Sequence, residues 1–148
     1  SYYDKKEENY TVYAKITIRD DRTIVKEKIL ESFSVSKKKD IGDVGITTSG
    51  DKSKFLIHRE PESKDEPQEL IGLCVYDSHL VKIYNRKFRF PNNKKFIVKD
   101  YLVTNSGKVV VIAYLKTPGT GMEDYISYKI FGVNEEGEEL EEIIIATG

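Results

Sequence analysis

Residues 99–115, KDYLVTNSGKVVVIAYL, carry the pattern that decides the fold. A short apolar strand is followed by an Asn-Ser-Gly turn and then by a longer apolar run. Residues 42–57 run through the same order, with a short strand, a Ser49-Gly50 turn and a second apolar run. A glycine in each turn, Gly50 or Gly107, permits the positive φ that tight hairpins demand. The two stretches therefore predict two similar β-hairpins, one in each half of the chain.

The rest of the chain is also typical of short strands. Apolar residues alternate with polar ones over residues 10–18, and a second strand is expected at 23–33 after a turn at 20–22. No apolar 3.6-residue period lasts long enough for a helix. We therefore predict an all-β chain of antiparallel strands at residues 10–18, 23–33, 41–48, 54–58, 70–76, 80–90, 97–104, 109–115, 125–133 and 138–145.

The two halves of the chain are related by one offset in the numbering. Asp100 follows Asp43 at an offset of 57 (100 minus 43), and Gly107 follows Gly50 at the same offset. At this offset apolar residues fall on apolar ones and turns on turns, as a structural repeat requires. The pattern predicts a disordered or linker end at 1–9, a partial four-stranded unit at 10–36 and full units at 37–93 and 94–148, in one continuous β domain.

A repeated unit of four short antiparallel strands is the pattern of a β-propeller blade. The units resemble those of bacterial cell-envelope repeat β-propellers in three features. An Asp precedes the innermost strand, a Ser-Gly turn follows it, and an Asp or Asn ends the third strand. Here these features are Asp43 and Asp100, Ser49-Gly50 and Ser106-Gly107, and Asp77 and Asn134.

The resemblance covers residues 10–146 and implies a propeller-like fold of two and a half blades, in a periplasmic, cell-surface or secreted protein. A closed propeller needs about four blades or more. Open sheet edges therefore imply an oligomer or a longer propeller of which this chain is a part. The alternative folds are a β-sandwich and an incomplete barrel.

Composition excludes several classes of partner. The 24 basic and 25 acidic residues balance, so no long-range field favours nucleic acid. No apolar stretch approaches the roughly 20 residues that span a bilayer as a helix. A single cysteine, Cys74, excludes a disulfide framework. We expect partners other than nucleic acid and a chain that does not span a membrane.

No motif for catalysis, metal or cofactor binding stands out. His58, His79 and Cys74 lie on different predicted strands and turns, without the spacing of a metal site. Residues 117–121, TPGTG, lack the Gly-Lys-Ser/Thr end of a phosphate-binding loop. The sequence therefore predicts no catalytic residue, no metal site and no cofactor.

The predicted function is a non-catalytic binding or interaction module for a protein or a carbohydrate. The longer loops at 59–69 and 117–124 take matching positions in the two units and are the expected contact surfaces. The residues expected to bind are Arg59, Glu62, Lys64, Thr117, Thr120 and Tyr125.

The alternative function is a fragment of a carbohydrate-active enzyme that uses Asp43 and Asp100 as glycosidase acids. A structural role competes with this reading, because an Asp beside a strand can accept hydrogen bonds from neighbouring backbone N–H groups. The sequence favours the structural role for both aspartates.

Overall fold

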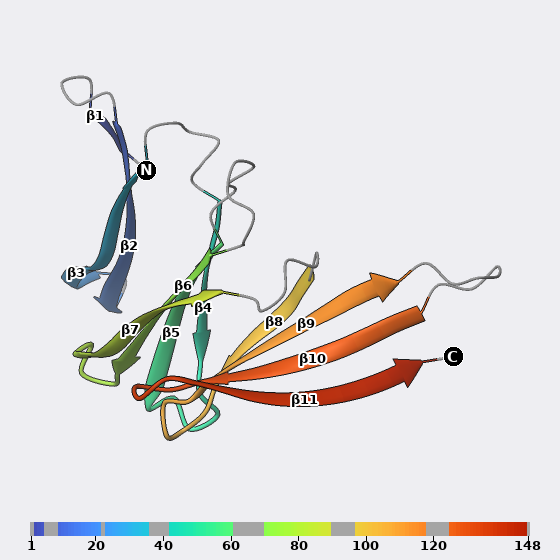
Figure 1. The fold of residues 1–148 in the computed structure, drawn as a ribbon. Coiled ribbons are helices and arrows are strands. Elements are labelled where there is room, and N and C mark those ends of the chain that lie inside the picture. The colour runs from blue at the N-terminus through green and yellow to red at the C-terminus, as the bar shows by residue number, and fades with distance from the viewer. Residues whose placement is uncertain are drawn as a thin grey trace. The chain divides into compact units, whose positions relative to one another are not determined.

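The structure, a computed structural model, describes residues 2–4, 9–21, 23–35, 42–60, 70–89, 97–117 and 125–147. Within these residues the chain forms β-strands and no helix, which confirms the all-β prediction (Figure 1). The strands are β1 (Tyr2–Asp4), β2 (Asn9–Asp20), β3 (Thr23–Val35), β4 (Asp43–Thr48), β5 (Lys54–Glu60), β6 (Leu70–Asp77), β7 (Lys82–Arg89), β8 (Ile97–Val103), β9 (Val109–Thr117), β10 (Tyr125–Val133) and β11 (Glu138–Thr147).

The strands form three antiparallel sheets in which neighbours in sequence are neighbours in space. Sheet A has the order β1-β2-β3, sheet B the order β4-β5-β6-β7, and sheet C the order β8-β9-β10-β11. The chain divides into two compact units, one with sheet A and one with sheets B and C. The two four-stranded sheets confirm the predicted four-stranded units.

Sheet A is the predicted hairpin with one more strand. β2 and β3 pair along their lengths and meet at a turn where Asp20 faces Thr23 and Asp21 has a positive φ of 41°. β1 was not among the expected strands, and it pairs with the start of β2, Tyr2 opposite Thr11. Its two tyrosines suit a strand, because aromatic side chains pack well on a pleated surface.

Sheets B and C share one hydrophobic core. Along β9 the burial alternates as the period of a strand dictates, with Val109, Val111 and Ala113 fully buried and Val110 and Ile112 half-buried. The rings of Phe88 and Phe131 join the two sheets at a centroid distance of 5.2 Å. The core residues are Leu56, Ile71, Leu73, Val75, Tyr84 and Phe88 from sheet B and Tyr101, Val103, Val109, Val111, Ala113, Phe131 and Val133 from sheet C.

The first hairpins of the two sheets have turns of the same kind but of different length. In sheet C, Gly107 N donates to Thr104 O, and Gly107 has a φ of 92°. In sheet B, Lys52 N donates to Ser49 O, and it is Lys52 that has the positive φ, 60°. Gly50 is the second residue of its turn and has no positive φ. The predicted equivalence of Gly50 and Gly107 is therefore wrong, although both lie in corresponding hairpins.

The turns that end the third strands agree with the predicted repeat. The side chain of Asp77 accepts hydrogen bonds from His79 N and Val81 N, each at 2.9 Å. The side chain of Asn134 accepts from Glu136 N and Gly137 N, at 2.9 and 2.8 Å, in a turn that is one residue shorter. Asp and Asn take this position because their short side chains bond the backbone a few positions ahead. The predicted offset, which places Asn134 on Asp77, is confirmed at these turns.

The offset is not constant, however. Phe55 faces Tyr76 beside the turns of sheet B, and Val109 faces Val133 at the same place in sheet C. Phe55 therefore corresponds to Val109 and not to Ile112, on which the predicted offset places it. The hairpin turn is shorter in sheet C and its second and third strands, β9 and β10, are longer than β5 and β6, so no single offset relates the two sheets. An ungapped alignment of the two halves of the sequence cannot detect these differences in length.

The corrected register shows how the two sheets stack. We call the core-facing side of sheet B its front face, with Leu56, Leu73, Val75 and Tyr84. In sheet C, the residues that correspond to Leu56 and Leu73 point away from the core, and their neighbours form the back face, with Val109, Val111, Phe131 and Val133 in the core. The front of one sheet thus packs on the back of the next.

Candidate functional site

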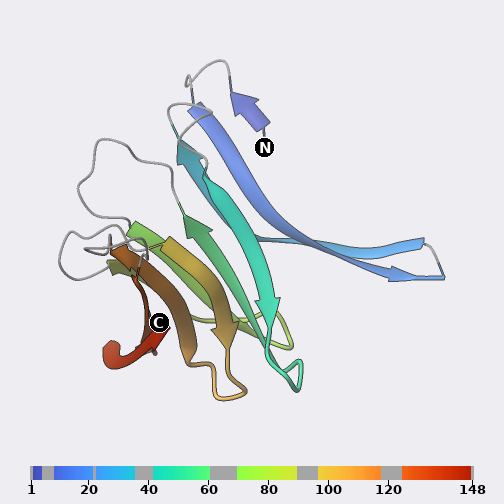
Figure 2. The ribbon, with the colours of Figure 1, turned by 90° about the vertical axis from the view of Figure 1, so that its right-hand side faces the viewer.

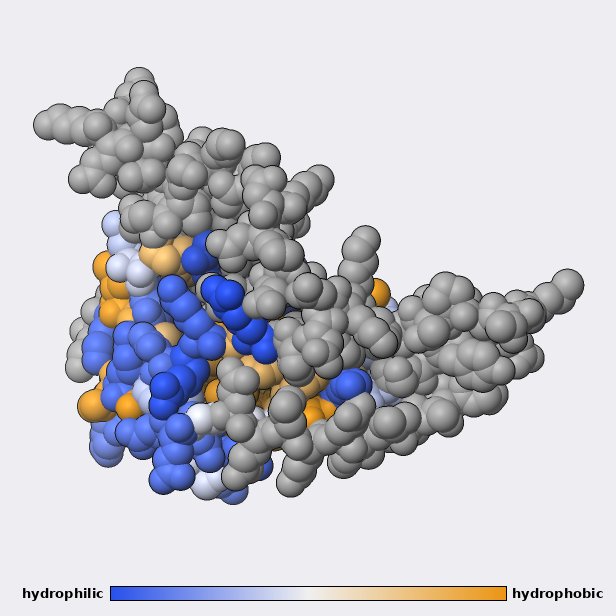
Figure 3. Space-filling view, viewed as in Figure 1, coloured by the Kyte–Doolittle hydropathy of each residue, from blue (hydrophilic) through white to orange (hydrophobic). Residues whose placement is uncertain are grey.

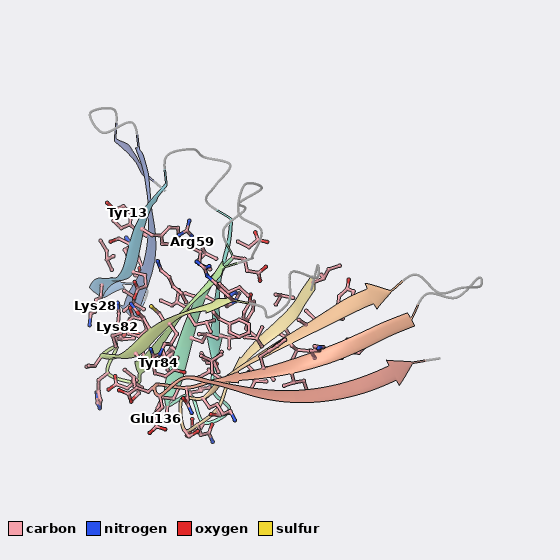
Figure 4. All side chains as sticks on the ribbon, viewed as in Figure 1. Tyr13, Lys28, Arg59, Lys82, Tyr84 and Glu136 are labelled. Atoms are coloured by element: carbon pink, nitrogen blue, oxygen red, sulfur yellow. The ribbon has the colours of Figure 1, made fainter. Side chains whose placement is uncertain are left out.

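The short turns of sheets B and C gather at one end of the second unit (Figures 1 and 2). A hollow with a volume of about 410 Å³ is formed by the start of β7, the β8–β9 turn and the β10–β11 turn. Its lining residues are Ile83, Tyr84, Ser106, Gly107, Lys108, Asn134, Glu135 and Glu136. Figure 4 places Tyr84 and Glu136 at this end of the strands and Arg59 at the other.

Tyr84 links the two sheets that form the hollow. Its hydroxyl lies 2.7 Å from Gly107 O and 3.2 Å from Val133 O, so its single hydrogen is shared between two carbonyls of sheet C. The side chain is 9% exposed, and burial raises the pKa of Tyr84 to about 12. A β7 residue of sheet B is thereby tied to two different turns of sheet C. Tyr84 is a neutral hydrogen-bond donor rather than a candidate acid or base near pH 7.

The rim of the hollow is fixed by further bonds between side chains and turns. The Arg86 guanidinium donates to the backbone carbonyl of Glu135. Asn134 fixes its own turn, as described above, and the hydroxyls of Ser106 and Thr104 lie 2.9 Å apart. Because these bonds preset the backbone, the polar groups of the rim are held in place before any ligand arrives.

The two first hairpins also touch. Asp51 N donates to Oδ1 of Asn105 at 3.3 Å, which links the β4–β5 turn to the β8–β9 turn. The buried Ser49 hydroxyl donates to Asp51 at 2.7 Å and accepts from Lys54 N at 3.0 Å. Hydrogen bonds from Ser53 N and from the Ser49 hydroxyl lower the pKa of Asp51 below its ordinary value. The short turns of the unit are therefore held by hydrogen bonds of their own side chains as well as of the backbone.

The lining offers contacts of several kinds. Lys108 brings a cation, Glu135 and Glu136 bring exposed anions, and Ile83 is an apolar side chain that is 36% exposed. The residues that the structure describes hold no group of three or more His, Cys, Asp or Glu side chains that could bind a metal ion. This arrangement suits recognition of a mixed polar and apolar surface.

Sequence reasoning identified the turns of the hollow but treated them as turn geometry alone. The missing information was the pairing of sheets, which brings β7 against residues 107 and 133. One signal was present, namely a tyrosine in β7 among basic and polar neighbours, since buried tyrosines usually bond their hydroxyl to a partner.

The predicted loop site is described only in part. Arg59 is half-buried in β5, opposite Gly72 of β6, and desolvation lowers its pKa. Thr117 ends β9 directly opposite Tyr125, the first residue of β10. The structure therefore brings Thr117 and Tyr125 together at the backbone. The other predicted binding residues, Glu62, Lys64 and Thr120, lie outside the described residues.

A small polar cluster lies near Arg59. The rings of His58 and Tyr101 stack at a centroid distance of 3.9 Å, and the Tyr101 hydroxyl donates to Glu60 at 2.5 Å. Gly45 makes room for the imidazole, since a Cβ there would lie 2.2 Å from Nε2 of His58. The cluster joins sheet B to sheet C near Arg59. His58 therefore has a packing role in the structure.

The other residues singled out in the sequence do not come together. Asp43 begins β4 and is exposed, whereas Asp100 lies within β8, beside a bulge. Asp100 accepts a hydrogen bond from Tyr101 N at 2.8 Å, which is the structural role predicted for it. His79 is exposed in the β6–β7 turn, and Cys74 is a half-buried residue of β6.

Comparison of the chain with protein-family models, with curated proteins and with solved structures gives no match. Among the described residues no helix is long and apolar enough to cross a membrane. The candidate site is therefore interpreted from its own geometry.

Proposed function

We propose that the chain is a non-catalytic binding module that uses the hollow at the turn end of sheets B and C to hold a protein ligand. The observation that supports this proposal is that residues of both sheets form the hollow. Tyr84 of one sheet fixes two turns of the other, and charged and apolar side chains border the same space of about 410 Å³. A preset, mixed surface of this kind loses little entropy on binding.

A protein ligand fits the lining better than a glycan does. The aromatic ring of the hollow belongs to Tyr84, which is buried and offers little exposed ring for a sugar to stack on. Lys108, Glu136 and Ile83 instead offer ionic and apolar contacts in the lining of one hollow, as interface surfaces commonly do. Hydrophilic residues prevail over the described surface around β7 in Figure 3, with hydrophobic ones between them.

The resemblance to cell-envelope propellers gives this proposal its wider setting. We propose that the four-stranded sheets act as blades and that their turns present the binding surface at one end of the blades. Arg59, Thr117 and Tyr125 belong to a second proposed contact surface. A location outside the cytoplasm is part of the same proposal.

Selection from a phage-displayed peptide library tests the proposed function. Peptides that bind the wild-type chain should lose at least tenfold in affinity for Glu136→Lys, about 1.4 kcal/mol, because the charge at the rim is reversed. The matched control is Lys87→Glu, which reverses an exposed charge of β7 outside the hollow. Selected peptides that bind all three proteins equally would place recognition elsewhere and refute the hollow as the site.

A glycan array and a hydrolysis assay on the same proteins separate the alternatives. Binding to glycans that depends on Glu136 would replace the protein ligand by a carbohydrate and keep the binding site. Release of sugars that is lost in Asp100→Asn, with folding preserved, would overturn the non-catalytic function.

A further inference from the structure

The outer edge of sheet B is basic. β7 is the last strand of this sheet, and its residues 86–89 read RKFR. Arg86, Lys87 and Arg89 are exposed, whereas Phe88 is fully buried. These four residues pair with β6 in regular register, and the register shift of β7 lies nearer to its start. Because bulges hinder the addition of a strand, this regular part of β7 is the part that another strand can reach.

The outer edge of sheet C is acidic in the same pattern. β11 is the last strand of this sheet, and its residues 138–141 read EELE. They pair with β10 in regular register, before the register shift of β11. The order of residue types is that of RKFR, namely two charged residues, an apolar one and a charged one, but the sign of the charge is reversed. Two β7 edges or two β11 edges would therefore repel each other, whereas one of each kind attracts the other.

We propose that β7 of one copy of this chain pairs in parallel with β11 of a second copy, so that sheet B continues into sheet C of the other molecule. Parallel alignment of RKFR with EELE places each basic residue beside an acidic one and Phe88 beside Leu140. An antiparallel alignment of the same residues would place Lys87 beside Leu140 and Phe88 beside Glu139. The charge pattern therefore favours the parallel direction.

The partner of β7 is a second copy because β11 of the same copy lies in another layer. Sheets B and C pack face to face through their common core, and β7 and β11 end separate sheets. Pairing between different strands of identical chains is heterologous, so it builds a ring or a filament. The contact is also distinct from the hollow, since Lys87, Phe88 and Arg89 do not line it.

Sedimentation velocity of the complete chain over a range of concentrations tests the proposal. The wild type should associate, and Lys87→Glu should raise the dissociation constant at least tenfold, because it places two acids side by side. Glu139→Lys should weaken association in the same way, and the double variant should restore it, since the two charges are then exchanged. Lys99→Glu is the matched control, because Lys99 is an exposed lysine of β8, the strand at the other edge of sheet C.

The outcomes of this experiment are decisive in either direction. A wild-type chain that remains monomeric at every concentration would overturn the proposal, as would a double variant that associates no better than the single ones. Equal weakening by Lys99→Glu would show an effect of overall charge and would also overturn it. Glu136→Lys should leave association unchanged, so that this proposal and the proposed function of the hollow fail separately; a loss there would place the contact at the hollow instead.

A synthetic peptide of residues 137–147 tests the strand pairing itself and leaves the fold of the protein unaltered. An added strand bonds its neighbour through the backbone N–H groups of alternate residues. Two versions of the peptide, N-methylated on one or the other alternate set, should therefore differ at least tenfold in affinity for the dilute wild-type chain, measured by fluorescence anisotropy. Equal affinities of the two versions would mean that no strand is added at β7, and would overturn the proposal.

Discussion

The hydroxyl of Tyr84 provides the contact that single substitution tests best. Tyr84→Phe removes the donor to Gly107 O and Val133 O and leaves both carbonyls near an apolar ring edge. We expect the free energy of unfolding to fall by about 1–2 kcal/mol, as for other buried hydrogen bonds. Urea denaturation followed by far-ultraviolet circular dichroism measures the loss. A variant as stable as the wild type would mean that the hydroxyl does not hold the turns.

The raised pKa of Tyr84 also predicts a pH dependence. A tyrosine ionises near pH 10 in the unfolded chain and at a pKa of about 12 in the folded chain. The folded state therefore binds the proton more tightly, and this contribution to stability is complete below pH 10 and is lost as the pH rises from 10 to 12. The difference in stability between the wild type and Tyr84→Phe should shrink over this range. A constant difference would contradict the assignment.

The glycines of the two hairpins are predicted to behave differently. Gly107→Ala puts a side chain on a residue with a φ of 92°, and we expect a loss of about 1–2 kcal/mol. Gly50→Ala is the matched control, because Gly50 lacks a positive φ and a Cβ there meets its nearest atom at 3.9 Å. The control should be neutral or slightly stabilising. Equal losses at both positions in thermal unfolding would contradict the turn assignment.

Gly45 is predicted to be constrained by space. A Cβ at this position would lie 2.2 Å from the imidazole of His58, which is held by its stack on Tyr101. Gly45→Ala should therefore cost about 1–3 kcal/mol, as overpacking does elsewhere. Because the clash is with one side chain, His58→Ala should remove most of the extra cost in the double variant. An additive double variant would show that Gly45 is constrained by something other than His58.

At the scale of strands and turns, Asp77 is predicted to make the β6–β7 turn sensitive to acid. A hydrogen bond from Val81 N, supported by one from His79 N, lowers the pKa of Asp77 below 3.8. Its folded pKa is thus below the unfolded one, so its contribution to stability is present above pH 3.8 and is lost as the pH falls through the folded value. Asp77→Asn keeps the acceptor, like Asn134, and should lose less stability between neutral and strongly acidic pH than the wild type does. Urea denaturation at the two pH values measures the difference, and equal losses would contradict the role of the carboxylate.

The strands themselves were predictable from the sequence, and the exact repeat was not. Alternation of apolar residues and the turn residues at Asp77 and Asn134 depend on local geometry, which one chain segment specifies alone. The equivalence of Phe55 and Val109 depends on which residues pair across strands. Lys52 illustrates the difficulty. A lysine gives no indication of a positive φ in the sequence, yet Lys52 has a positive φ in the β4–β5 turn. The hollow was missed for the same reason, because Tyr84 acquires its partners only when two sheets stack.

At the scale of the whole molecule, sheets B and C should unfold as one cooperative unit, although the sequence suggests two separate repeats. Phe88 and Phe131 come from different sheets, are 0% and 2% exposed, and contact each other in the common core. Each change to Leu should cost about 1–3 kcal/mol, as substitutions in a packed core commonly do. A double-mutant cycle should give a coupling of about 0.5–1.5 kcal/mol, the range for tilted aromatic pairs.

Hydrogen exchange distinguishes one cooperative unit from two independent repeats. Slow amides of β6 in sheet B and of β9 in sheet C should exchange with the same free energy of opening, because neither sheet keeps its core face covered without the other. Phe131→Leu should then lower that free energy equally in both sheets, although the substitution lies in sheet C alone. A drop confined to sheet C would show that the sheets open separately, and front-on-back stacking would then contribute little to the stability of either sheet.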